Sequence, residues 1–215
     1  MSEEELRNLV ERNLAAQTVS TETGLKVAEK IKEIVAQENI EFAIAGGLAM
    51  HLYGFERATK DVDFLANKRL PVTPLRYLSF GGERYEIEIG GEKIDVDWIM
   101  RLDNYKELYH QALADATDIR QWRVLTPEWL VVLKYIAGRG KDRLDILWLL
   151  QQKDLVKRKV VKKNLEKVLG KLGAVGFLLG LQREYDLADV MGLRAAGDEN
   201  ESYIPDDDIY PEDNE

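Results

Sequence analysis

The amino-acid sequence predicts an α+β fold in which a β-sheet is flanked by helices and followed by a C-terminal helical extension. Short β-prone segments alternate with helical patterns up to about residue 125, and only helical patterns follow. The chain has 215 residues, 45% of them hydrophobic, which is enough for a substantial core. We expect an N-terminal helix in residues 1–22, a core in 23–125, a helical region in 126–194 and an acidic disordered tail in 195–215.

Capping and periodicity place the elements of the first two segments. Ser2 and Glu5 form a capping-box pattern, which indicates a helix from about Glu3 to Ala16. Glycine pairs at 46–47, 81–82 and 90–91 mark turns, and the segment 93–99 alternates between apolar and polar residues. We therefore expect helices over 23–37, 48–53 and 106–116, and strands over 40–45, 62–65, 85–89, 93–99 and 122–125.

The region after residue 125 is predicted to be helical throughout. Thr126-Pro127-Glu128 supplies a cap, a first-turn proline and a first-turn acid, and the helix that follows is apolar on almost every side. Gly138-Arg139-Gly140 breaks that helix. Further helices are expected over 142–152, over the strongly basic stretch 153–171, and over 174–193.

Composition excludes several classes of site. The chain has no cysteine and two histidines, which leaves no disulfide, thiolate metal site, cysteine nucleophile or multi-histidine zinc site. The net charge of −9 equals the nine acidic residues of the tail, so the body of the chain is neutral. No segment is long and apolar enough to span a membrane, and the acidic N-terminus lacks a signal-peptide pattern. We expect a cytoplasmic protein without a membrane partner.

Four aspartates on two predicted strands are the strongest functional pattern. Asp61 and Asp63 share one face of their strand, and Asp95 and Asp97 share one face of theirs. If these strands are neighbours, at least three carboxylates meet, and such a cluster needs a cation because like charges repel. Hard divalent cations, above all Mg²⁺ and alternatively Mn²⁺, fit such oxygen ligands together with substrate phosphates.

The glycine pair adds a second element of the same site. Gly46-Gly47 lies where a strand ends and a helix begins, so its backbone N–H groups and small size suit the approach of a phosphate. Metal carboxylates together with a phosphate cradle predict two-metal phosphoryl or nucleotidyl transfer.

These residues resemble a known superfamily. Ala45-Gly-Gly, thirteen further residues, Asp61-Val-Asp63 and a third strand aspartate are similar to the DNA polymerase beta-like nucleotidyltransferases. Within them, Arg57-Ala-Thr-Lys-Asp-Val-Asp63 and the stretch from Leu133 to Ile146 resemble small prokaryotic members, including toxins of abortive-infection and toxin–antitoxin systems. The resemblance covers about residues 24–150 and implies a nucleotidyltransferase-type mixed sheet with helices around it.

The resemblance also implies roles for individual residues. Asp61, Asp63 and Asp95 would bind the metals, with Asp97 as the alternative to Asp95, and Asp95 would help to activate the acceptor hydroxyl. The β- and γ-phosphates or the nucleotide would be held by Gly46, Gly47, Arg57, Thr59 and Lys134. Many members have Gly-Ser where this chain has Gly46-Gly47, which removes one hydroxyl contact to phosphate.

Several residues have a structural explanation beside the functional one. Lys134 interrupts an apolar helix, so it either pairs with Asp142 or Asp145 or reaches the active site as a cation. Arg57 is a phosphate contact or a surface charge, and His51 is interpreted as helix surface or packing. The basic stretch 153–171 is a solvated face, an RNA-binding face or a partner of the acidic tail.

The sequence thus predicts an enzyme that transfers a nucleoside monophosphate from a nucleoside triphosphate, such as ATP, to an acceptor hydroxyl and releases pyrophosphate. The acceptor would be an RNA end such as that of tRNA, a protein side chain or a small molecule, and an antitoxin-like protein is a possible partner. The alternative is a catalytically weak or silent binding subunit on the same fold, acting through a protein partner.

Overall fold

The computed structural model describes residues 2, 4, 5, 7 and 18–191, which form two compact units divided between Leu125 and Thr126. At the N-terminus, Ser2 and Glu5 make the reciprocal contacts of a capping box: the Glu5 N–H donates to Ser2 Oγ at 3.1 Å, and the Ser2 N–H donates to Glu5 Oε2 at 2.6 Å. The rest of the predicted first helix, residues 8–17, and the predicted tail lie outside the described residues.

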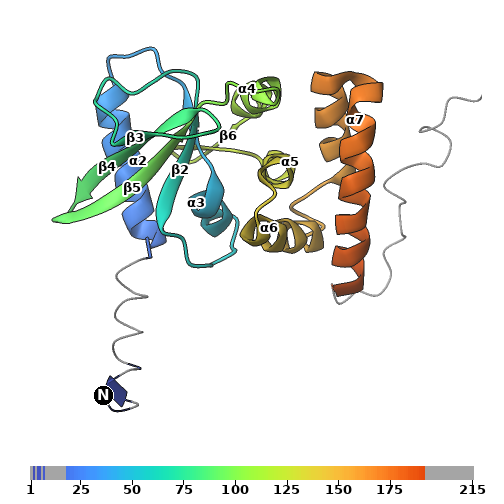
Figure 1. Cartoon of the computed structure of the whole chain (residues 1–215), viewed down its shortest axis with the longest axis horizontal. Coiled ribbons are helices and arrows are strands. Elements are labelled where there is room, and N and C mark those ends of the chain that lie inside the picture. Colours follow the sequence, from blue (N-terminus) through green and yellow to red (C-terminus); the bar gives the residue numbers. More distant parts are fainter. Residues whose placement is uncertain (1, 3, 6, 8–17, 192–215) are drawn as a thin grey trace, which may run out of the picture. The chain divides into compact units, whose positions relative to one another are not determined.

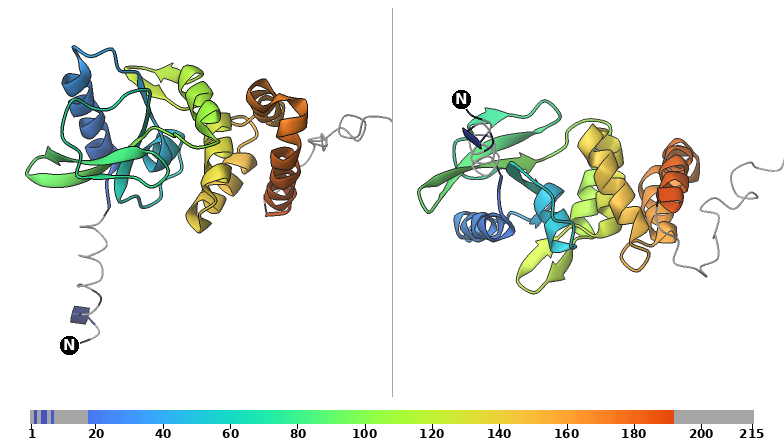
Figure 2. Two further views of the ribbon diagram at one scale, coloured as in Figure 1. Left: turned by 45° about the horizontal axis from the view of Figure 1, so that its top comes forward. Right: turned by 90° about the horizontal axis from the view of Figure 1, so that it is seen from below.

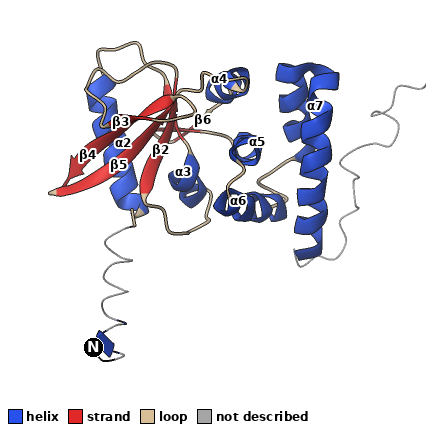
Figure 3. Ribbon diagram, viewed as in Figure 1, coloured by secondary structure: helices blue, strands red, loops and turns tan. Residues whose placement is uncertain are grey.

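The first unit is built on a mixed β-sheet (Figure 1; Figure 3, strands in red). The described residues form a seven-stranded sheet in the order β3-β4-β5-β2-β1-β7-β6. β2 pairs in parallel with β5 and β1 with β7, whereas the other neighbours are antiparallel. The strands are β1 Phe42–Ile44, β2 Asp61–Ala66, β3 Arg76–Tyr77, β4 Gly82–Ile89, β5 Glu92–Ile99, β6 Thr117–Ile119 and β7 Trp122–Val124.

Three helices pack against this sheet: α2 Thr21–Val35, α3 Gly46–Leu52 and α4 Lys106–Ala114 (Figure 2). The side chain of Ser20 caps α2 by accepting from the Thr23 N–H, which explains why α2 starts two residues before the predicted start at residue 23. Helix α4 ends earlier than predicted because the chain enters β6 at Thr117. The expected strands and helices of the core are all present, whereas β3 and β6 are additions at the two edges.

The two faces of the sheet differ in character because strand residues alternate. Val62 and Phe64 of β2 and Val96 and Trp98 of β5 are fully buried on one face. Phe64 and Trp98 are part of an aromatic group with Phe42, with ring centroids 5.4–5.8 Å apart. The intervening residues of β2 and β5 are the four aspartates, so the apolar face anchors the strands and fixes where the carboxylates point.

The second unit is helical, as predicted. It contains α5 Pro127–Ala137, α6 Gly140–Gln151 and α7 Arg158–Met191. The Thr126 hydroxyl accepts from the Trp129 N–H at the start of α5, and Gly138 ends that helix in a left-handed conformation. Gly170 lies outside helical geometry within α7, so a break separates its basic first part from its second part, close to the predicted boundary. No helix in the described ranges has both the length and the apolarity to cross a membrane.

Candidate active site

The four aspartates meet on one face of two neighbouring strands. In the parallel pairing of β2 with β5, Asp61 lies beside Asp95 and Asp63 lies beside Asp97. The predicted carboxylate cluster required these two strands to be neighbours, and in the structure they are. Side-chain exposure differs among the members: 39% for Asp95, 18% for Asp61 and 13% for Asp97.

An arginine that is not among the predicted site residues lies inside this cluster. Arg84 Nε and Nη2 donate to the two carboxylate oxygens of Asp97 at 2.5 and 2.8 Å. Arg84 Nη1 donates to Asp95 Oδ2 at 2.8 Å, and Nη2 also donates to Asp61 Oδ2 at 3.0 Å. One guanidinium, itself only 16% exposed, thus contacts three carboxylates.

The position of Arg84 follows from the β4–β5 hairpin. In this antiparallel pair Arg84 lies opposite Asp97, so both side chains are on the polar face of the sheet. The arginine side chain is long enough for its guanidinium to reach across β5 to Asp61 on β2. Hydrogen bonding to Asp97 raises the pKa of Arg84 above its ordinary value, although burial opposes this. Arg84 is a permanent cation here, and three carboxylates around it leave two formal negative charges unbalanced.

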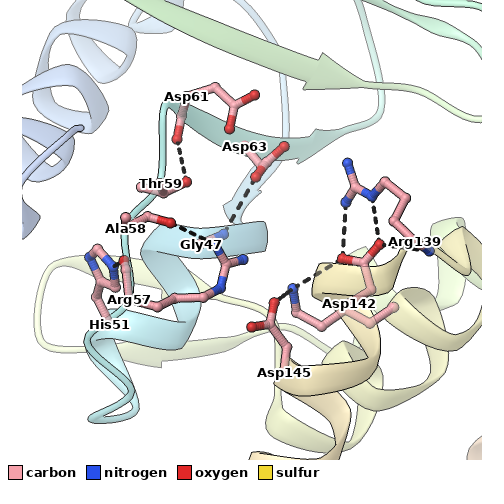
Figure 4. A network of polar contacts seen from close by, with 11 residues as sticks. Gly47, His51, Arg57, Ala58, Thr59, Asp61, Asp63, Arg139, Asp142 and Asp145 are labelled. Atoms are coloured by element: carbon pink, nitrogen blue, oxygen red, sulfur yellow. Dashed lines mark hydrogen bonds and ion pairs between the residues drawn. The ribbon is translucent and has the colours of Figure 1, made fainter. Parts of the chain in front are cut away.

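Asp63 faces the glycine turn (Figure 4). Its Oδ2 accepts from the Gly47 N–H at 3.4 Å, and its backbone carbonyl accepts from the Ala45 N–H at 2.9 Å. A Cβ at Gly46 would overlap the Asp63 carboxylate, and Gly46 has a φ of +53°. Only glycine satisfies both conditions, so the first glycine of the pair serves to bring the carboxylate against the start of α3.

Gly47 is small for a different reason. A Cβ on Gly47 would overlap the hydroxyl of Thr59, which is 5% exposed and donates to the Asp61 carbonyl at 3.2 Å. Thr59 therefore occupies the space that the serine of a Gly-Ser pair would need. This chain has Gly47 where many members have serine, and the hydroxyl of Thr59, from the loop before β2, lies in the space next to Gly47.

The Gly47–Thr59 packing gives a testable pair. Gly47→Ser is expected to destabilise the fold by roughly 1–3 kcal/mol, because it overpacks against Thr59. Adding Thr59→Gly should recover most of that loss, since it removes the obstructing side chain. Urea unfolding of the two single variants and the double variant measures the coupling. Strict additivity of the two single effects would show that the two positions do not compete for space.

The loop that carries Arg57 and Thr59 is held by His51. His51 Nε2 donates to the Arg57 carbonyl at 2.5 Å, and its Nδ1 accepts from the Thr21 hydroxyl at 3.1 Å. The Arg57 guanidinium donates to the Ala58 carbonyl at 3.0 Å. His51 is thus a packing residue, as interpreted from sequence, and it ties α2 and α3 to the loop before β2.

Lys134 belongs to the second unit, where it forms a buried ion pair with Asp145. Its Nζ lies 2.5 Å from Asp145 Oδ2 and 3.7 Å from Asp142 Oδ1, and both carboxylates are fully buried. Arg139 donates to both oxygens of Asp142. Burial alone would raise the pKa of Asp142, but Arg139 and Lys134 together lower it below its ordinary value. Of the two alternatives for Lys134, the ion pair is present.

The donor set has the chemistry of a magnesium site, and Arg84 lies where its carboxylates converge. The carboxylate oxygens of this set are hard ligands, and their unbalanced negative charge suits a divalent cation. Within the described ranges, however, no group of three or more Asp, Glu or His side chains is arranged as a ready-made metal site. Asp61, Asp63, Asp95 and Asp97 therefore fit a metal by ligand type, and Arg84 provides the positive charge that contacts Asp61, Asp95 and Asp97.

Residues 23–168 match a protein family described as a nucleotidyltransferase of unknown function (DUF6036). The chain belongs to this nucleotidyltransferase family. The match spans the sheet with the carboxylate cluster, α5, α6 and the first part of α7. Membership gives the general class of the fold, and it leaves open the reaction and the acceptor of the family.

The chain is 16% identical to an antigenic nucleotidyltransferase-like protein from Paracoccidioides brasiliensis, with a TM-score of 0.45 over 79% of this chain and 94% of the other. No curated protein matches the chain.

Proposed function

We propose that this nucleotidyltransferase-family protein transfers a nucleoside monophosphate from a nucleoside triphosphate to an acceptor hydroxyl, with Mg²⁺ or Mn²⁺ as cofactor. The observation that carries the proposal is the register of β2 and β5, which places Asp61 beside Asp95 on the face that also carries Asp63. Mg²⁺ or Mn²⁺ bound there would neutralise the charge that develops on the phosphoryl oxygens and lower the pKa of the attacking hydroxyl.

The chain's own residues have distinct roles in this proposal. Asp61 and Asp63 supply metal ligands, and Asp63 does so directly against the Gly46–Gly47 turn, where the phosphates would approach. Asp95 is the third ligand in preference to Asp97, because Asp95 is the register partner of Asp61 and the more exposed of the two. Thr59 donates to the Asp61 carbonyl, and Arg57, two residues before Thr59 in the same loop, is proposed to contact the nucleotide or its phosphates.

Lys134 has a less direct place in the proposal. The resemblance implies a role for Lys134 as a nucleotide contact, whereas its Nζ is paired with Asp145 at 2.5 Å. We assign Lys134 to stabilisation of the helical unit, and Gly46, Gly47, Arg57 and Thr59 to the nucleotide.

The acceptor is proposed to be a hydroxyl of an RNA end, a protein side chain or a small molecule. These three remain equal on chemical grounds, because the superfamily places different acceptors on one catalytic core. The resemblance to abortive-infection toxins adds the proposal that an antitoxin-like protein partners the chain.

Donor binding is tested by thermal unfolding with each of the four nucleoside triphosphates, with and without Mg²⁺. A ligand present at about 100 times its Kd stabilises the folded state by roughly 2.7 kcal/mol. We expect such a shift for at least one triphosphate, only with the metal, and its loss in Asp63→Asn, which removes a charge while keeping the shape of the side chain. Glu86→Gln is the matched control, because Glu86 lies on the same face of the sheet but pairs with Lys93. A shift that persists in Asp63→Asn would contradict the assignment.

The second candidate is a catalytically silent binding subunit. The contacts of Arg84 with Asp61, Asp95 and Asp97 favour it, because a permanent arginine would replace the metal altogether. This candidate predicts no nucleotide shift, and it predicts that an Asp61/Asp63/Asp95→Ala triple variant keeps its binding to a protein partner. Loss of partner binding in that variant would count against it.

A further inference from the structure

We propose that Arg84 is a built-in counter-ion of the metal site, which must release Asp61 and Asp95 before a divalent cation binds and which stays attached to Asp97. This inference rests on the proposed function, since it concerns the same carboxylates. It makes Arg84 a positioning residue that sets the metal affinity, and it makes Asp97 the anchor of Arg84.

The contacts of Arg84 with Asp97 differ from those with Asp61 and Asp95 in number and geometry. Its bond to Asp97 is bidentate, with Nε–Oδ1 at 2.5 Å and Nη2–Oδ2 at 2.8 Å, and the two residues face each other in the β4–β5 register. Asp95 and Asp61 receive one hydrogen bond each, at 2.8 and 3.0 Å. The two weaker attachments are therefore those to the side-by-side residues Asp61 and Asp95, which are the proposed metal ligands.

Charge explains why Arg84 releases Asp61 and Asp95 only when a divalent cation binds in its place. Four aspartates on adjacent strands repel one another, so in the apo protein Arg84 lowers the cost of keeping them together. Asp61 and Asp95, whose Oδ2 atoms accept from Arg84, would serve as ligands of a divalent cation, which carries twice the charge of the guanidinium. Arg84 and the cation therefore compete for the same carboxylates, and the apparent metal affinity is lower than the carboxylates alone would give.

The competition predicts the direction and size of one substitution. Arg84→Gln removes the competing charge, so the cluster is expected to bind a divalent cation at least about 10- to 100-fold more tightly, because each of the two charge-assisted hydrogen bonds that Arg84 gives up has about that value. The same variant should be less stable than wild type without metal, because the carboxylates lose their counter-ion, and should gain more stability from added metal.

The experiment is a titration of the full chain with Mn²⁺, without nucleotide and at constant ionic strength. Electron paramagnetic resonance measures the concentration of free Mn²⁺ and thus the affinity. Arg76→Gln is the matched control for long-range electrostatics, because Arg76 is the register neighbour of Arg84 on β3 and is exposed. Its Mn²⁺ affinity should stay within about 2-fold of wild type, since removal of one exposed charge is strongly screened. The double variant Asp61→Asn/Arg84→Gln should lose the gain in affinity, which places the ion at Asp61.

The outcomes separate this inference from the proposed function. Equal Mn²⁺ affinity in wild type and Arg84→Gln overturns the competition and leaves the proposed function standing. An equal gain in Arg76→Gln also overturns it. Absence of Mn²⁺ binding in wild type and Arg84→Gln alike overturns the inference, and if binding is also absent with a nucleoside triphosphate present, the metal-dependent function itself is overturned. If Arg84→Gln does not fold, Arg84→Met serves instead: it also removes the charge and keeps much of the length of the side chain, and an affinity unchanged from wild type overturns the inference.

Discussion

Replacing Asp63 with asparagine is expected to reduce nucleotidyl transfer by a factor of about 10³ or more, while the protein keeps its fold. The expected size is that of removing a group which stabilises charge only in the transition state, together with weakened metal binding. Asparagine keeps the volume of Asp63 and can still accept from the Gly47 N–H, so the contact with the glycine turn survives. The loss should therefore appear in turnover and hardly in thermal stability.

The measurement is release of pyrophosphate from the triphosphate that stabilises the protein, with total cellular RNA or protein supplied as acceptor. Glu86→Gln provides the control, because it removes a carboxylate from the polar face of β4 that is bound to Lys93 at 2.6 Å. We expect its rate to remain within about 2-fold of wild type, as for an exposed ion pair. Turnover in Asp63→Asn equal to that of Glu86→Gln would disprove a catalytic role for the Asp61–Asp63 pair.

The fold was predictable wherever apolar periodicity was clear. The alternation of Ile94, Val96 and Trp98 against Asp95 and Asp97 predicts both the strand and its two faces, and the structure confirms them. The edge strands β3 and β6 have two and three residues, all exposed, so no burial pattern marks them in the sequence. These edge strands form because a neighbouring strand, β4 for β3 and β7 for β6, offers hydrogen-bonding groups.

Arg84 could have been found from the hairpin turn. The two-residue turn Gly90-Gly91 has positive φ at both positions and pairs Ile89 with Glu92. Counting outward from that turn places Arg84 opposite Asp97 on the same face. The position of the turn in the sequence therefore predicts the contact between Arg84 and Asp97. The alternating pattern of β4 alone does not distinguish Arg84 from other polar residues of that strand.

The contact between Arg84 and Asp61 was beyond sequence reasoning. β2 and β5 are parallel neighbours separated by a long connection, and no turn fixes their register. Only the three-dimensional sheet shows that Asp61 lies beside Asp95. In the same way, the ion pair and the active-site cation are equal explanations of Lys134 at the level of sequence, because an apolar helix shows that its lysine needs a partner and does not identify that partner.

Asp145→Asn is expected to lower the free energy of unfolding by about 3–5 kcal/mol, the cost of removing one partner from a buried ion pair. Lys134 is 5% exposed and lies 2.5 Å from Asp145, so its charge would remain in the interior of the helical unit. Asp142, at 3.7 Å, is already bound to Arg139 and compensates only in part. Urea unfolding followed by far-ultraviolet circular dichroism measures the change.

Two comparison variants show whether the loss comes from the buried charge. Glu184→Gln breaks the Arg143–Glu184 pair, whose arginine is 59% exposed, and should cost less than about 1 kcal/mol. The double variant Lys134→Met/Asp145→Leu removes both charges, leaves Arg139 on Asp142, and should be more stable than Asp145→Asn alone. If the double variant were instead destabilised by the sum of its two single changes, no interaction between Lys134 and Asp145 would be needed to explain the data. The burial of a lysine in an apolar helix would then have to be attributed to packing of its methylene groups.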